Sequence, residues 1–145
     1  MKNIFVLINT LFLLISCVIF LAPVQAGVSV PVDAQAFWKT FRTAVLADNR
    51  DKVVSITQFP FKTRGDLDDD PIRSYHKKAG FLKIYDRIFS EHSYDASMTV
   101  KKVIENKKRI VAKDFLHKNA IRIENLVFEK KRGKWCFTFA YVMED

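Results

Sequence analysis

The chain has 145 residues, and its 24 Lys and Arg against 16 Asp and Glu give a formal net charge of +8 at pH 7. Its length and its 49% hydrophobic content are enough for one domain with a core, and two cysteines exclude a disulfide-rich fold. The positive charge favours anionic surroundings, such as lipid headgroups, cell-wall polymers or an acidic partner.

The N-terminus has the order of a secretory signal peptide. Lys2 precedes an apolar run from Ile4 to Ala22, and the small residues Val24 and Ala26 stand where a signal peptidase needs them. We therefore predict a signal peptide over residues 1–26 and a single exported domain, periplasmic or secreted, over residues 27–145. Nucleic acid is not an expected partner of such a protein.

Two other interpretations of this segment stay open. The apolar run is nearly long enough to span a bilayer, so it could remain as an anchor. Leu14-Ile15-Ser16-Cys17 also resembles a bacterial lipobox, which would make the protein an envelope lipoprotein lipidated at Cys17. Against that interpretation, the apolar run continues beyond the cysteine. After cleavage only Cys136 remains, and we expect a buried thiol or a crosslink between two chains.

Three helices are predicted in the first half of the domain. Ala34, Trp38 and Phe41 begin an apolar stripe with helical spacing, with Asp33 as N-cap. Asp48 is predicted to cap a shorter second helix. A third helix is predicted from Ser74, its cap, to about residue 92.

The rest of the domain is predicted to be sheet. Residues 58–61 suggest a short edge strand, because Pro60 cannot donate to an interior ladder. After Ser97, β-branched and aromatic residues predict strands at 98–104, 109–115, 120–128 and 134–143. Strict alternation in the last strand predicts one face of large side chains, Trp135 to Met143, and one of small ones. The predicted fold class is α+β, with three N-terminal helices packed on a strongly curved antiparallel β-sheet.

The stretch RGDLDDDP, residues 64–71, concentrates four carboxylates. Asp66, Asp68 and Asp70 alternate as calcium ligands do, but Lys77 occupies the twelfth position, where a calcium loop requires Glu, and Pro71 occupies the glycine position. The integrin-binding tripeptide Arg-Gly-Asp is too short to be informative. We predict a solvated loop and no metal site.

Two segments, FWKTFRTAVLADNRDKVVSITQFPF and IRSYHKKAGFLKIYDRIF, precede an aromatic final strand. This pattern resembles small exported bacterial proteins of the nuclear transport factor 2-like superfamily, whose cone-shaped fold is shared with ketosteroid isomerase. The resemblance covers nearly all of residues 33–143. It implies a pocket between helices and sheet, which some members use for catalysis and many for binding or dimerisation. No residue-level match carries catalytic positions over to this chain.

The predicted pocket is apolar, and its expected occupant is a small apolar ligand or a protein partner. Its candidate lining residues are Phe37, Phe41, Phe81, Tyr85, Phe137, Phe139 and Tyr141. We assign no catalytic residue and expect no cofactor. Under the alternative of an isomerase, dehydratase or hydrolase, a tyrosine would pair with Asp86 or Asp114 in a closed cavity. An interior filled by phenylalanine would instead favour a non-catalytic binding or interaction module.

His76, His92 and His117 stand far apart in the chain and do not suggest a zinc site. Basic clusters are more informative, because they fall on predicted strands and hairpin turns. The candidate anion-binding residues are Lys107, Lys108, Arg109, Lys130, Lys131 and Arg132. The same lysines could instead protect a solvated sheet edge from aggregation. A homodimer through the sheet is a further expectation.

Overall fold

A computed structural model describes residues 29–93 and 97–143. The predicted signal peptide, its cleavage point after Ala26 and the lipidation candidate Cys17 lie outside these residues. Within them, no helix is long and apolar enough to cross a membrane. The helices and strands, with the short 3-10 helix η1, are α2 (Val32–Leu46), α3 (Arg50–Ser55), β1 (Thr57–Arg64), β2 (Arg73–Tyr75), α4 (Lys78–Ser90), α5 (Val100–Asn106), η1 (Ala112–Asp114), β3 (Phe115–His117), β4 (Ala120–Ile123), β5 (Leu126–Lys131) and β6 (Lys134–Tyr141).

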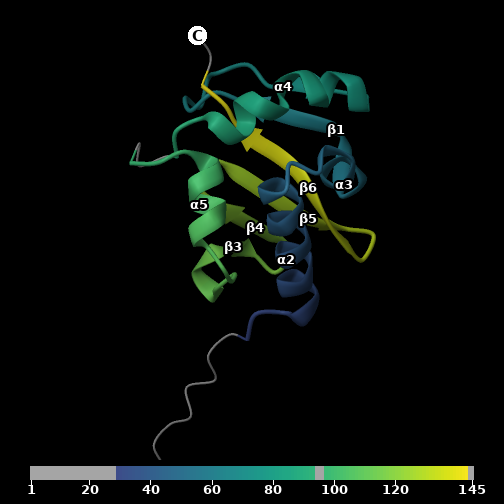
Figure 1. The fold of residues 1–145 in the computed structure, drawn as a ribbon, viewed down its shortest axis with the longest axis vertical. Coiled ribbons are helices and arrows are strands. Elements are labelled where there is room, and N and C mark those ends of the chain that lie inside the picture. The colour runs from purple at the N-terminus through teal and green to yellow at the C-terminus, as the bar shows by residue number, and fades with distance from the viewer. Residues whose placement is uncertain (1–28, 94–96, 144–145) are drawn as a thin grey trace, which may run out of the picture.

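The α+β class is confirmed, but the predicted sheet was wrong in two respects. The six strands have the order β2-β1-β6-β5-β4-β3, and β1 runs parallel to β6 while the other neighbours are antiparallel, so the sheet is mixed. The sheet also lacks the strong curl of a cone (Figure 1). Its helices α2, α4 and α5 lie against one face.

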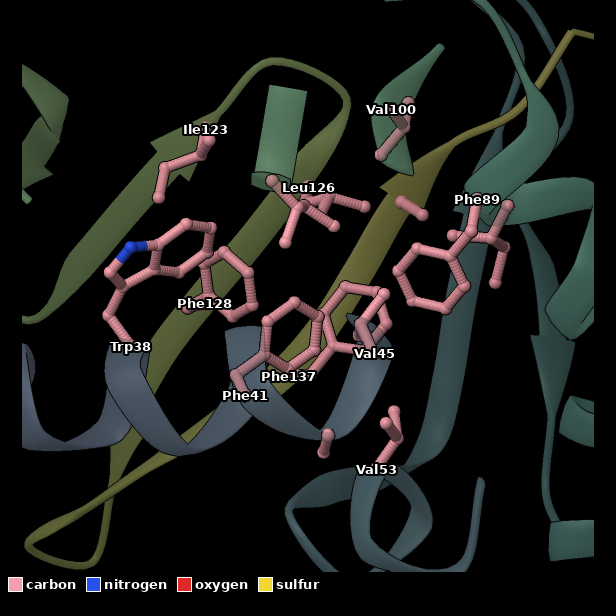
Figure 2. Packing of buried hydrophobic residues seen from close by; sticks show 14 of the residues in the cluster. Trp38, Phe41, Val45, Val53, Phe89, Val100, Ile123, Leu126, Phe128 and Phe137 are labelled. Atoms are coloured by element: carbon pink, nitrogen blue, oxygen red, sulfur yellow. The ribbon is translucent and has the colours of Figure 1, made fainter. Parts of the chain in front are cut away.

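Aromatic side chains fill the layer between the helices and that face. Phe41 of α2 meets Phe128 of β5 and Phe137 of β6 with ring centroids 4.8 and 5.1 Å apart (Figure 2). Edge-on contacts of this kind add to the large apolar area that each ring buries. Among the described residues, every member of the core cluster lies between Ala34 and Val142, so residues 27–145 contain this cluster complete.

The three predicted helices are present as α2, α3 and α4, but each begins at a different residue than predicted. α2 begins at Val32 after Pro31, and Asp33 lies in its first turn. The N-cap of α3 is Asn49, whose side chain accepts a hydrogen bond from the Lys52 amide at 3.0 Å, instead of Asp48. α4 begins only at Lys78, because Ser74 pairs in β2. Proximity to β1 therefore outweighs the capping preference of Ser74.

The strand predicted at residues 98–104 is a helix, α5. The Thr99 hydroxyl caps it by accepting from the Lys102 amide at 3.3 Å, and Val100 and Ile104, one turn apart, both face the core. Burial of this stripe overrides the β preference of its branched residues.

Two more predicted strands are broken up in the structure. Within 109–115, η1 precedes the short strand β3. Residues 120–128 contain the hairpin of β4 and β5, which turns at Glu124 with a φ of +50°. The sequence did not predict this turn, because Glu124-Asn125 is not a strong turn signal and apolar residues flank it on both sides.

β1 lies inside the sheet between β2 and β6, so the predicted edge strand was wrong. Pro60 is tolerated because β2 pairs only with residues 61–63 and the register with β6 shifts between Thr57 and Lys62. The missing amide hydrogen therefore falls where the ladder is already interrupted.

A bulge in β6 overturns the predicted alternation of its faces. Phe128 pairs with Phe137 but Val127 pairs with Phe139, so Thr138 is an extra residue. Beyond it, Ala140 points into the core with Val142, while Phe139 and Tyr141 turn to the face without helices. We call this the helix-free face. The predicted set of large side chains is thus divided between two faces.

Candidate functional site on the helix-free face

The predicted interior pocket is filled by its own lining. Phe41, Phe81 and Phe137 have no exposed surface, and Tyr85 is 3% exposed. Phe37 packs against this core with partial exposure. The structure therefore brings these five candidates together as core.

A hollow lies outside the core, at the ends of β1, β4 and β6. We call it the basin, and its volume is about 740 Å³, within the range of ligand sites. Its lining residues are Arg64, Asp66, Leu67, Asp68, Lys113, Asp114, Leu116, Arg122, Glu124 and Tyr141. Tyr141, one of the predicted pocket residues, thus lines this basin, on the helix-free face.

Tyr141 lies between two arginines. The guanidinium of Arg122 lies 4.4 Å from its ring centroid and that of Arg64 lies 5.6 Å away. The Phe139 ring lies edge-on to the Tyr141 ring, with 4.9 Å between the ring centroids. Cation–π contacts of this kind attract each guanidinium to the ring and help to hold it beside Tyr141.

The two arginines are positioned by the loops around them. Arg64 reaches Asp68 with 3.2 Å between Nη2 and Oδ1, and its Nε is buried without a hydrogen-bond partner in the described chain. Nε of Arg122 donates to the backbone oxygen of Glu124 at 2.9 Å. Loop residues thus hold both guanidiniums near the Tyr141 ring.

The acidic stretch forms one wall of the basin. Asp70 closes the loop by accepting from the Leu67 amide at 2.8 Å. A Cβ at Gly65 would collide with the carboxylate of Asp70, so a larger residue here would displace the side chain that closes the loop. Among residues 29–93 and 97–143, no three His, Cys, Asp or Glu side chains are grouped to hold a metal.

Exposed leucines complete the rim. Leu67 is 65% exposed and Leu116 is 59% exposed, and both line the basin. Ile72 and Val111, also exposed, lie in the two segments that form the basin walls. Exposed apolar side chains gathered at one hollow mark a contact surface more strongly than scattered ones do.

A smaller cavity of about 340 Å³ lies beside Tyr85. The Tyr85 hydroxyl is buried without a hydrogen-bond partner in the described residues, and burial raises the pKa of Tyr85 to about 12. Arg50 forms ion pairs with both neighbouring carboxylates. Its Nε lies 3.2 Å from Oδ1 of Asp48, and its Nη2 lies 2.6 Å from Oδ1 of Asp86. The tyrosine therefore stays protonated, and neither carboxylate is free to act as a base.

The predicted basic clusters lie elsewhere, around the start of α2. Lys107 pairs with Asp114 at 2.8 Å, Lys130 with Asp33 at 2.5 Å and Lys131 with Glu129 at 3.1 Å. The other three candidates, Lys108, Arg109 and Arg132, are exposed.

Searches against protein-family models, curated proteins and solved structures found no match to this chain.

Arg122, Leu67 and Leu116 were not among the predicted binding residues. Arg122 stands between Ile121 and Ile123, and this alternation alone places it on the face away from the core. What the sequence did not reveal is its neighbour, since the bulge at Thr138 decides that Tyr141 shares its face.

Proposed function

We propose that the protein is a non-catalytic binding protein that holds a peptide segment in the basin around Tyr141. The observation that supports this most is the placement of Arg64 and Arg122 on either side of an accessible tyrosine ring. The filled interior argues in the same direction, because it leaves no space there for an apolar substrate.

The lining favours a peptide over a neutral apolar ligand. Three basic and four acidic side chains line the hollow. A peptide offers carbonyls and carboxylates to the guanidiniums, amides and cations to Asp66 and Asp68, and apolar side chains to Leu67 and Leu116. Aromatic and arginine side chains are also the groups that most often dominate binding to proteins.

The enzyme alternative has less support. Of its two candidate carboxylates, Asp86 beside Tyr85 is bound by Arg50 in two places. Asp114, which lines the basin with Tyr141, is bound by Lys107. Membership in the nuclear transport factor 2-like superfamily stays a prediction, and the proposed site does not depend on it.

Selection from a random peptide library on the immobilised protein tests the proposal. We expect selected peptides whose affinity falls at least tenfold in Tyr141→Ala, which removes the central ring, and in Arg122→Gln, which removes one of the two guanidiniums beside it. Lys39→Gln, on the exposed face of α2, is the matched control and should leave affinity unchanged.

Two results would count against the peptide site. One is a library that yields no binder above background. The other is peptides that bind all variants alike. Self-association that Tyr141→Ala abolishes, measured by sedimentation, would instead identify a second copy of the chain as the occupant of this face.

A further inference from the structure

We propose that the end of the domain around the start of α2 binds an anionic lipid surface. This inference is independent of the basin. Its residues, which we call the basic end, are Lys108, Arg109, Lys118, Lys131, Arg132 and Lys134.

Three separate segments meet at this end, two through contacts with α2 and the third through Lys130. Gln35 exchanges hydrogen bonds with Ile110 in the connection after α5, at 2.5 and 3.2 Å. Asp33, two residues earlier, binds Lys130 of the β5–β6 hairpin. The backbone of Lys130 in turn donates to Asn119 of the β3–β4 turn at 2.8 Å. In Figure 1 the α5–β3 connection and the β5–β6 hairpin flank the lower end of α2.

The charge at this end is largely uncompensated. The carboxylates of these segments, Asp33, Asp114 and Glu129, each bind a lysine, and the bond from Lys130 lowers the pKa of Asp33. In the described part of the chain, five cations of the basic end have no ion-pair partner. These are Lys108, Arg109, Lys118, Arg132 and Lys134. They are spread over three exposed segments, which suits a broad charged surface better than one small anion.

The position of the preceding chain supports a membrane as the source of that surface. Residues before Ser29 join the domain at this end, and they include the apolar run from Ile4 to Ala22. If that run or a lipid on Cys17 holds the protein at a bilayer, the basic end is the part nearest the headgroups. A polybasic patch beside such a segment strengthens binding to anionic lipid.

Vesicle co-sedimentation of residues 27–145, which contain the core cluster complete, tests the proposal without the N-terminal segment. We expect binding to phosphatidylcholine vesicles with about a third phosphatidylserine, none to pure phosphatidylcholine, and loss of binding at high salt. Each neutralised cation should lower the partition coefficient about fivefold. The doubles Lys108→Gln/Arg109→Gln and Arg132→Gln/Lys134→Gln should therefore each lose at least tenfold.

The control double Lys52→Gln/Lys83→Gln removes the same charge from α3 and α4, and it should bind nearly as well as the unmodified protein. Equal loss in the control would contradict the proposal, because net charge alone would then explain binding. Equal binding to both vesicle types would also contradict it. Displacement by inorganic phosphate at constant ionic strength would point instead to a discrete phosphate site.

Discussion

Phe137 and Phe139 stand two residues apart in one strand, yet they lie on opposite faces of the sheet. The extra residue at Thr138 reverses the alternation, so Phe137 joins the core while Phe139 supports Tyr141. The sequence gives no sign of this one-residue bulge, because large and small side chains alternate without interruption through Thr138. The prediction that Phe137, Phe139 and Tyr141 share one face was therefore wrong, and the position of the basin depends on this difference.

Alanine substitutions test this assignment. Phe137→Ala should lower the free energy of unfolding by about 3–5 kcal/mol, because it removes a fully buried ring from a packed core. Phe139→Ala, at a half-buried position, should cost about 1–2 kcal/mol. Urea denaturation of both variants gives the comparison, and equal losses would mean that both rings lie in the core.

The buried hydroxyl of Tyr85 predicts a pH effect. Since its folded-state pKa is raised from 10.0 to about 12, its contribution to stability is complete below pH 10 and is lost as pH rises through 12. The unmodified protein should therefore lose about 2 kcal/mol relative to Tyr85→Phe by about pH 11.5. At pH 7 the variant should be as stable or more stable, because an unpartnered buried hydroxyl is removed. Denaturation at both pH values measures this, and a pH-independent difference would show that the hydroxyl is solvated.

At the scale of elements, α5 shows what sequence patterns could and could not predict. Its branched residues Val100, Val103 and Ile104 suggested a strand, although Val100 and Ile104 also have the spacing of a helical stripe. In contrast, α2 and α4 were predictable because their stripes run over three or more turns. Short elements stay ambiguous, since packing against neighbours decides them.

Thr99→Val separates the two assignments for this segment. As the N-cap of α5, Thr99 loses its hydrogen bond to the Lys102 amide, and we expect a cost of about 1 kcal/mol in thermal or urea unfolding. In a strand, valine would be neutral or stabilising. Thr40→Val, within α2, is the matched control, with an expected change within about 0.5 kcal/mol. A stabilised Thr99→Val protein would argue against the helix.

At the scale of the whole molecule, the sheet has one covered face and one open face. The order of the predicted elements indicated the α+β class, which the structure has. The resemblance suggested a site inside that core, but the described interior is packed with phenylalanine. Arg64, Arg122 and Tyr141 come from distant parts of the chain, and only the order and register of the strands bring them together.

The most direct test of the account is to map the bound peptide by chemical-shift changes in the uniformly labelled protein. We predict that the largest changes fall on Arg64, Arg122 and Tyr141, with smaller changes at Leu67 and Leu116. The side chains of the core between helices and sheet should stay unperturbed. Changes centred on Phe41, Phe81 and Phe137 would show that a ligand enters between the helices and the sheet, and would contradict the account.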